Sequence, residues 1–345
     1  MSANVKVMPS GREFIVEDDE TILEAALRQN VILPYGCKNG ACGSCKVKIV
    51  EGMVAQGTHS SSALKPEEVV QGYGLMCCAT AQGDLTIEAR TVAAAGDIPV
   101  RKMPCRVASI EKPVSDVAIV RLQLPANERL QYLAGQYVEL LLRDGSRRSY
   151  SMATAPHDAD QIELHIRHMP GGKFTDTVFG ASQPALKERD ILRFEGPLGT
   201  FFLREDSKKP IVFVASGTGF APIKAIIEHC IHREIGREMI LYWGGRRPRD
   251  LYLHGLAEHW ANSVPGFRYV PVISDALPED NWNGRVGFVH RAVMEDFSKL
   301  EGHQVYACGA PIVVDSARRD FIDQCGLSED DFFADSFTSA ADLAS

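Results

Sequence analysis

A short segment crowded with cysteine and glycine constrains this chain more than any other feature. Cys37, Cys42 and Cys45 have the spacing C-x4-C-x2-C, and the adjacent Cys77 and Cys78 complete a group of five. The N-terminal residues lack the apolar stretch of a secretory signal, so we expect a cytoplasmic location. Clustered cysteines in such a reducing compartment indicate a metal centre rather than disulfides. The chain around them is then expected to form a loop, because the segment is too rich in glycine and cysteine for a helix or strand.

The cysteine spacing is the plant-type arrangement for a 2Fe–2S cluster, in which one later cysteine supplies the fourth ligand. A loop around such a cluster needs glycine, because backbone N–H groups must approach the sulfur atoms and part of the backbone turns left-handed. Zinc is the alternative, but structural zinc sites usually have two C-x2-C pairs, and this segment has only one. The sequence therefore predicts a 2Fe–2S cluster held by Cys37, Cys42, Cys45 and Cys77, with room made by Gly36, Gly40 and Gly43.

The fourth ligand could come from either of two adjacent cysteines. The frame Gly72-Tyr-Gly-Leu-Met-Cys77 resembles the Gly-Tyr-x-Leu-x-Cys of plant-type ferredoxin domains. This resemblance favours Cys77, and Cys78 is then expected to be an ordinary packed thiol.

Hydrophobic periodicity divides the chain into three domains. Residues 1–92 predict short strands around one helix, whose start has the capping-box form Thr21-x-x-Glu24, as in a β-grasp plant-type ferredoxin domain. Residues 93–102, with small residues and proline, are expected to be a linker. Residues 103–205 contain successive strand patterns that predict an antiparallel β-barrel. Residues 206–345 alternate strands and helices, which predicts a doubly wound parallel sheet and makes the whole chain a multidomain α+β and α/β protein.

Two short motifs in the predicted barrel are suited to a flavin nucleotide. One is Arg148-Ser149-Tyr150-Ser151, in which a guanidinium can grip a phosphate while an aromatic ring lies against the isoalloxazine. The other begins a predicted helix, whose N–H groups and hydroxyl suit a pyrophosphate; it consists of Gly171, Gly172, Lys173, Phe174 and Thr175. Each motif is weak alone, and their order within one barrel-like segment makes the prediction specific.

The predicted parallel sheet carries a glycine-rich turn between its first strand and helix. It contains Gly217, Thr218, Gly219, Ala221 and Pro222, small residues that let a pyrophosphate approach the backbone. It is not the G-x-G-x-x-G fingerprint, because Pro222 stands at the third glycine. A second motif, Cys308-Gly309-Ala-Pro311, follows a later strand. A buried cysteine at a strand end is the alternative interpretation of Cys308.

Residues 103–345 resemble the ferredoxin–NADP reductase superfamily, whose motifs include Arg-x-Tyr-Ser, Gly-x-x-Ser/Thr, Gly-Thr-Gly-x-Ala-Pro and Cys-Gly-x-Pro. The resemblance implies FAD, with FMN as the minor alternative, and places Cys308 beside the reacting atoms of flavin and nicotinamide. It makes Tyr150, Ser151 and Cys308 the candidate catalytic residues. It also implies that an aromatic residue, Phe337 or a neighbour, lies against the flavin, although a core strand explains the C-terminal phenylalanines nearly as well.

The coenzyme preference depends on the segment after the second parallel strand. Arg246, Arg247 and Arg249 could hold the 2′-phosphate of NADPH, or they could form a solvated basic loop. The stretch resembles the Gly-x-Arg-x-x-x-Asp-Leu-Tyr segment of NADH-using oxygenase reductases. This resemblance favours NADH and makes Arg246 a candidate coenzyme-binding residue.

The whole chain, in the order ferredoxin, flavin and nicotinamide, resembles the single-chain reductases of bacterial oxygenases and the CDP-6-deoxy-Δ3,4-glucoseen reductase group. The resemblance implies that NAD(P)H transfers a hydride to FAD, and that FAD passes single electrons to the cluster. The cluster would then reduce a partner protein, which could be an oxygenase, a monooxygenase or a sugar dehydratase. A redox sensor without a dedicated partner is the alternative, and a simple electron carrier would need broken nucleotide motifs, which are intact. The net charge of −8 argues against binding to nucleic acid or an anionic membrane.

Overall fold

A computed structural model describes residues 2–89, 98–158 and 160–337. The chain forms two compact units. The first contains residues 1–99 with 199–201 and the segment from 335 onward, and the second contains 100–198 and 202–334. The predicted flavin and nicotinamide segments thus pack together as one unit. The predicted linker 93–102 lies outside the described residues at 93–97, and its last two residues already belong to a strand.

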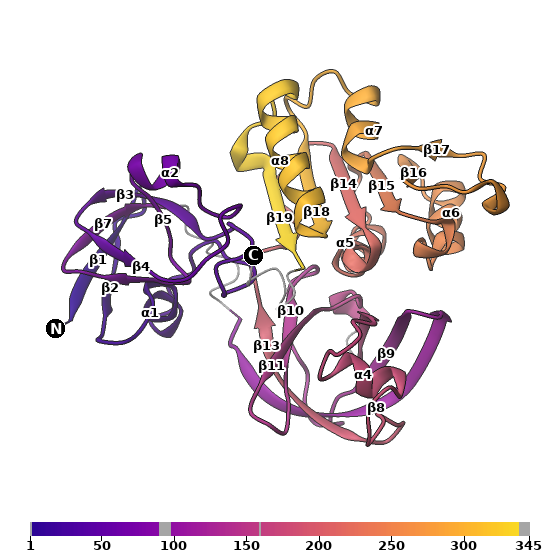
Figure 1. Cartoon of the computed structure of the whole chain (residues 1–345), viewed down its shortest axis with the longest axis horizontal. Coiled ribbons are helices and arrows are strands. Elements are labelled where there is room, and N and C mark those ends of the chain that lie inside the picture. The colour runs from indigo at the N-terminus through magenta and orange to yellow at the C-terminus, as the bar shows by residue number, and fades with distance from the viewer. Residues whose placement is uncertain (1, 90–97, 159, 338–345) are drawn as a thin grey trace. The chain divides into compact units, whose positions relative to one another are not determined.

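The first unit is a β-grasp fold, in which helix α1 accompanies a five-stranded sheet (Figure 1). Its sheet has the order β2-β1-β7-β3-β5, with β1 and β7 parallel and the other neighbouring strands antiparallel. A separate pair is formed by β4 and β6. The elements are β1 (Ala3–Met8), β2 (Arg12–Val16), α1 (Ile22–Arg28), β3 (Lys46–Glu51), β4 (Val54–Gln56), α2 (Pro66–Val70), β5 (Tyr73–Leu75), β6 (Ala79–Ala81) and β7 (Leu85–Glu88).

The predicted capping box at the start of α1 is confirmed. The Glu24 backbone N–H donates to Thr21 Oγ1 at 3.2 Å, and the Thr21 N–H donates to Glu24 Oε2 at 2.9 Å. These bonds satisfy two of the N–H groups that a helix start leaves without partners. The helix buries Ile22 and Leu23, while the polypeptide between α1 and β3 is left free of regular structure for the cysteine loop.

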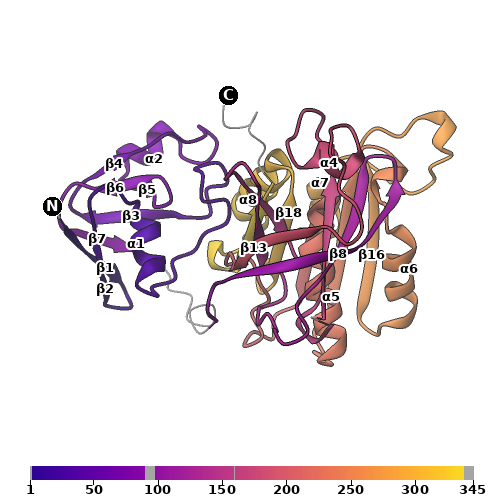
Figure 2. The same cartoon turned by 90° about the horizontal axis from the view of Figure 1, so that it is seen from below.

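Residues 101–198 form a six-stranded antiparallel sheet in the order β11-β10-β13-β8-β9-β12. An isolated bridge between Met152 and Leu164 joins its two edge strands, so the sheet curls round toward the predicted barrel. The long strand β8 is prominent in Figure 2. The elements are β8 (Arg101–Val114), β9 (Val117–Gln123), β10 (Tyr137–Leu141), β11 (Arg147–Ser151), η1 (Pro156–Asp158), β12 (Gln161–Arg167), α4 (Thr175–Phe179) and β13 (Ile191–Leu198).

The rest of the second unit is a doubly wound sheet in the order β17-β16-β15-β14-β18-β19. The pairs from β17 to β18 are all parallel, as the alternation of strands and helices predicts. The elements are β14 (Ile211–Ser216), η2 (Gly217–Gly219), α5 (Phe220–His232), β15 (Met239–Gly245), η3 (Pro248–Asp250), α6 (His254–Ser263), β16 (Phe267–Ile273), η4 (Pro278–Asp280), β17 (Arg285–Val286), α7 (Val289–Asp296), β18 (Gln304–Gly309), α8 (Pro311–Cys325), η5 (Glu329–Asp331) and β19 (Phe332–Ser336).

The two faces of the parallel sheet are covered by different helices, with α7 and α8 on one side and α5 on the other (Figure 1). Val305 and Ala307 of β18 belong to the core that includes α7 and α8. Side chains alternate along a strand, so Cys308 faces the α5 side. On that side Phe220 of α5 stacks on Trp243 of β15, with ring centroids 3.9 Å apart. Among the described residues, no helix combines the length and apolar character needed to cross a membrane.

Candidate cofactor and coenzyme sites

The four predicted cluster ligands lie in one partly buried loop region of the first unit. Cys42, Cys45 and Cys77 are buried, and Cys37 is half-buried. The Cys37 N–H donates to Cys42 Sγ at 3.4 Å, and the Cys42 N–H donates to Cys37 Sγ at 3.3 Å. A hydrogen bond to Cys37, together with burial, raises the pKa of Cys42 well above its ordinary value. A hydrogen bond to Cys77, again with burial, does the same to the pKa of Cys45.

The four thiols therefore contact one another, Cys37 with both Cys42 and Cys77, and Cys45 with Cys77. Within the described ranges, no three His, Cys, Asp or Glu side chains converge as ligands of one metal ion. Structural zinc needs four ligands around one ion, whereas four cysteines shared between two irons supply two to each. Four cysteines in mutual contact, with the C-x4-C-x2-C spacing, fit a 2Fe–2S cluster. Buried thiolates in contact would repel each other, and positively charged iron offsets that repulsion.

Two of the predicted glycines have backbones that turn left-handed, Gly40 with φ 77° and Gly43 with φ 71°. A Cβ on Gly40 would also lie 2.9 Å from the Thr58 carbonyl oxygen. Gly36 is needed for a different reason, because a Cβ there would lie 3.2 Å from Cys42 Sγ. The loop is thus shaped so that backbone closely approaches the sulfur atoms.

Cys78 contacts the Cys77 side chain but also has partners outside the four predicted ligands. Its Sγ accepts a hydrogen bond from Gln56 Nε2 at 3.0 Å and lies 3.7 Å from the Leu75 carbonyl oxygen. Gln56 is itself fixed, since its Oε1 accepts the Leu75 N–H at 3.0 Å. This arrangement supports Cys77 as the fourth ligand.

The first flavin motif lies on β11, an edge strand paired with β10. The Arg148 guanidinium donates to the Arg147 carbonyl oxygen at 2.7 Å, and none of the described carboxylates forms an ion pair with it. Its neighbour Arg147 instead pairs with Glu139 at 2.9 Å and Glu195 at 2.7 Å. Of the two arginines, Arg148 is therefore the one whose guanidinium is available to bind a phosphate. Ser149 lies beside it on the strand, and Ser151 is buried.

The second flavin motif lies close to the first. The rings of Tyr150 and Phe174 have centroids 5.7 Å apart. Thr175 Oγ1 donates to the Met169 carbonyl oxygen at 2.8 Å, which closes the turn before α4. Gly172 has no room for a side chain, because a Cβ would lie 2.4 Å from that hydroxyl oxygen. Gly171 is left-handed, with φ 82°, and Lys173 pairs with Asp144 at 2.7 Å on the surface.

The two predicted nicotinamide motifs meet where β14 and β18 end. A Cβ on Gly219 would lie 2.1 Å from the Cys308 carbonyl oxygen, and one on Gly309 would lie 2.5 Å from the Ser216 carbonyl oxygen. The Ala310 N–H donates to Ser216 Oγ at 3.0 Å. Segments about ninety residues apart are thereby held backbone to backbone at the carboxyl edge of the sheet, the usual ligand-binding edge of such folds.

The remaining residues of these motifs support that junction. Thr218 is buried in η2, whereas Ala221 and Pro222 are buried in the first turn of α5. Cys308 is fully buried, and Pro311 begins α8. Phe337 follows β19 and belongs to the first unit, so its contact with the flavin remains a prediction.

The basic segment after β15 is organised by Asp250. Its Oδ2 accepts the N–H groups of Arg246 at 2.8 Å and Arg247 at 3.2 Å. The Arg247 guanidinium forms a two-pronged bond with Asp280, at 2.8 and 2.9 Å. The Arg246 side chain is 76% exposed. Arg247 therefore differs in environment from the exposed Arg246 and Arg249, which the sequence did not indicate.

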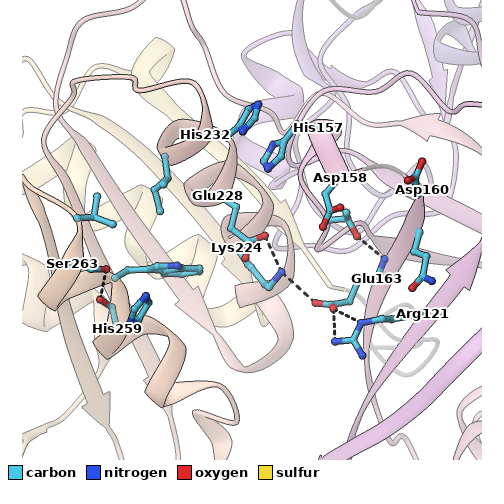
Figure 3. A pocket seen from close by; sticks show the side chains of 15 residues that line it. Arg121, His157, Asp158, Asp160, Glu163, Lys224, Glu228, His232, His259 and Ser263 are labelled. Carbon is cyan, nitrogen blue, oxygen red and sulfur yellow. Dashed lines mark hydrogen bonds and ion pairs between the residues drawn. The ribbon is translucent and has the colours of Figure 1, made fainter.

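A buried polar network, which the sequence patterns did not predict, joins β12, α5 and the segment after η3. His165 contacts Tyr252 Oη through Nδ1 at 2.7 Å and Glu163 Oε1 through Nε2 at 2.9 Å. Because a carboxylate only accepts, a neutral His165 donates through Nε2 and accepts from Tyr252. Lys224 lies 3.3 Å from Glu163 and donates to Glu228 at 2.9 Å (Figure 3). The signal in the sequence was the period-2 series Glu163, His165 and Arg167, a polar face that is covered here rather than solvated.

The missed network borders a cavity of about 710 Å³ (Figure 3). Burial raises the pKa of Glu163, but the hydrogen bond from His165 and the charge of Lys224 outweigh it and lower the pKa to about 2. On the cavity wall His157 stacks on His232, with ring centroids 3.7 Å apart. These contacts join the antiparallel-sheet segment to α5 and to the segment after η3.

Arg167, at the end of β12, was also missed. Its Nη2 would lie 3.4 Å from a Cβ on Gly217, and its Nη1 donates to Asp116 at 2.6 Å. A positive charge thus stands beside the glycine-rich turn, where a pyrophosphate is predicted to bind.

Three protein-family models match successive parts of the chain. The "2Fe-2S iron-sulfur cluster binding domain" matches residues 5–82, the "Oxidoreductase FAD-binding domain" residues 104–203, and the "Oxidoreductase NAD-binding domain" residues 213–319. The predicted cofactors, 2Fe–2S cluster, FAD and nicotinamide coenzyme, are thereby confirmed, and so is the predicted fold class.

Curated relatives span the whole chain. The CDP-6-deoxy-L-threo-D-glycero-4-hexulose-3-dehydrase reductase of Yersinia pseudotuberculosis is 42% identical over 337 residues, covering 98% of this chain and 99% of that protein. Reductase component 2 of the terephthalate 1,2-dioxygenase of Comamonas is 36% identical, covering 98% of each. Among solved structures, the Amycolatopsis cytochrome P450 reductase GcoB is 34% identical with a TM-score of 0.76, covering 98% of this chain and 99% of that one.

Proposed function

The chain belongs to the family of reductases that join a 2Fe–2S domain, an FAD-binding domain and an NAD-binding domain, and we propose that it supplies single electrons from NADH to a separate partner protein. Its enzyme class is that of a flavoprotein oxidoreductase. The observation that carries the proposal is that one chain contains two kinds of site. Its contacting cysteine thiols are suited to an iron–sulfur cluster, which transfers one electron at a time, and its glycine-rich turn is suited to a nicotinamide coenzyme, which donates a hydride.

In this proposal the described residues bind and orient rather than react. Arg148 holds a flavin phosphate, and Tyr150 with Phe174 lines the flavin site. Gly217 and Gly219 let the coenzyme pyrophosphate approach the backbone next to Arg167. Cys308 and Ser151, both buried, exclude water beside the reacting atoms. Bound FAD supplies the chemistry that links two-electron hydride transfer to single-electron transfer.

The partner we favour is a dehydrase that acts on a nucleotide-linked deoxysugar. The Yersinia relative named for such a dehydrase is 42% identical, whereas relatives named for a dioxygenase, a hydroxylase, a monooxygenase or a demethylase are 35–37% identical. An oxygenase partner is the second candidate, because those relatives also match nearly the full chain. We propose a cytoplasmic location, where clustered thiols stay reduced.

The order of electron flow can be tested in the full-length protein. Cys77→Ser should leave FAD bound and NADH-dependent ferricyanide reduction largely intact, because the flavin can reduce this small acceptor directly. The same variant should lose most NADH-dependent cytochrome c reduction, which needs the cluster as the exit. Cys78→Ser is the matched control and should retain both activities. Equal loss of both activities in Cys77→Ser, with FAD still bound, would contradict the proposed order.

The partner is tested by adding purified acceptors to the reduced protein. We expect faster electron transfer to a sugar dehydrase than to an oxygenase component, measured as acceptor-dependent NADH oxidation. A preference for the oxygenase would replace the first candidate with the second.

A further inference from the structure

We propose that Asp280 sets the coenzyme preference, by holding Arg247 in an ion pair that keeps this arginine from a 2′-phosphate. The inference rests on the proposed NADH-dependent function and identifies a residue that determines its specificity. Asp280 stands outside every motif recognised in the sequence, about thirty residues after the arginine that it holds.

The two residues meet at the edge of the sheet where a coenzyme is expected. Arg247 follows the carboxyl end of β15, and Asp280 lies in η4, after the carboxyl end of β16. The two loops run side by side, with the Ser274 N–H donating to the Gly245 carbonyl oxygen at 2.9 Å and the Asp275 N–H to the Arg246 carbonyl oxygen at 2.9 Å. In doubly wound sheets, the adenosine ribose is recognised near the end of the second strand. A small cavity of about 160 Å³ lies here, lined by Arg247, Arg249 and Asp280.

The ion pair uses the same hydrogen-bonding geometry that a phosphate would use. Arg247 Nε donates to Asp280 Oδ2 at 2.8 Å, and Arg247 Nη2 donates to Oδ1 at 2.9 Å. A guanidinium binds carboxylate and phosphate through the same pair of parallel bonds, so one excludes the other. Asp280 is fixed in place, because its Oδ2 also accepts the Leu277 N–H at 2.9 Å. A 2′-phosphate would have to displace this carboxylate and lie next to its charge.

Charge on the two loops is balanced as well. Arg246, Arg247 and Arg249 on the basic loop face a loop that carries Asp275, Glu279 and Asp280. Glu279 lies 3.7 Å from Arg247 but is exposed, so its charge is screened by solvent. The half-buried Asp280 is therefore the acid whose removal changes the site most.

The test compares nucleotide binding to the FAD- and cluster-loaded protein by calorimetry, with 2′,5′-ADP and 5′-AMP as probes. Asp280→Asn and Asp280→Ala should bind 2′,5′-ADP about tenfold more tightly than the unaltered protein. Each substitution removes a carboxylate that would repel the phosphate, and it frees the Arg247 guanidinium to bind that phosphate. Their affinity for 5′-AMP should be unchanged. The ratio of kcat/KM for NADPH to that for NADH should rise by a similar factor.

Two further variants isolate the ion pair. Glu279→Gln removes a charge of the same sign next to Arg247 and should leave the binding of 2′,5′-ADP nearly unchanged. Arg247→Ala combined with Asp280→Asn should abolish the gain, because the freed guanidinium is its source. The inference would be overturned if Asp280→Asn folds normally but binds 2′,5′-ADP no more tightly than the unaltered protein does. It would also be overturned if the unaltered protein binds 2′,5′-ADP more tightly than 5′-AMP. Failure to oxidise NADH would overturn the proposed function instead, and the nucleotide affinities would still decide the role of Asp280.

Discussion

The cysteine loop and the nicotinamide region are built in opposite ways. Three of the four proposed cluster ligands lie within nine consecutive residues, Cys37 to Cys45, and the loop geometry follows from the glycines between them. The nicotinamide region is assembled from η2, the end of β18, the end of β12 and two loops after β15 and β16. A site made of neighbouring residues can be recognised as a motif. In a site made of distant segments, the motif shows where the ligand binds, and residues outside the motif determine which ligand is preferred.

The largest expected effect separates Cys77 from Cys78. Cys77→Ser should abolish the cluster, because it removes one member of the contacting pair with Cys45. Cys78→Ser should retain about two irons and two acid-labile sulfides per chain. Iron and sulfide analysis with the visible absorption spectrum checks both. Loss of the cluster in Cys78→Ser alone would reassign the fourth ligand.

A second prediction tests whether the nicotinamide region depends on backbone contact between distant segments. Gly219→Ala should lower the free energy of unfolding by about 3 kcal/mol, because its Cβ would overlap the Cys308 carbonyl oxygen. NADH oxidation should fall as well, since the turn must shift. Gly255→Ala, in α6 with open space around the glycine, is the control and should be neutral or slightly stabilising. Urea denaturation measures both, and equal stability of the two variants would contradict the close packing.

A third prediction concerns the flavin motif, which is local like the cysteine loop. Arg148→Ala should weaken FAD binding about ten- to a hundredfold, because it removes a charge-assisted bond to phosphate. Arg147→Ala, one residue away, should leave FAD affinity nearly unchanged, since Arg147 is engaged by Glu139 and Glu195. Titration of the FAD-depleted protein gives both dissociation constants. An equal loss in the two variants would contradict the assignment of the phosphate contact to Arg148.

The smallest expected effect is a pH dependence of the second unit. Burial lowers the pKa of His157 and of His165 in the folded protein, while the unfolded chain keeps values near 6.5. As the pH falls through that value, the unfolded state takes up protons that the folded state does not, so the free energy of unfolding decreases. Urea denaturation at pH 7.5 and 5.5 measures the decrease, and His157→Gln should reduce it. A second unit that is more stable at pH 5.5 would contradict the lowered pKa values.

Much of the fold could be predicted because its signals are local. The Thr21–Glu24 capping box, the period-2 strands and the alternation of strands with helices all depend on residues close in sequence. The polar series Glu163, His165 and Arg167 shows where such signals fail. Its periodicity marks one face of a strand, but only packing determines whether that face meets water or a second sheet. In this protein it meets α5 and Tyr252.

The sequence by itself determined the cofactor classes and the order of the three domains, because thiol spacing and glycine turns are fixed by the chemistry of what they bind. Only the tertiary structure decided which residues surround those motifs. The pairing of Cys37 with Cys42, the contact of Gly219 with Cys308 and the capture of Arg247 by Asp280 all join atoms that chain folding brings together. A carboxylate thirty residues away can neutralise an arginine as well as a neighbour can, since electrostatic and steric interactions depend on distance in space rather than along the chain.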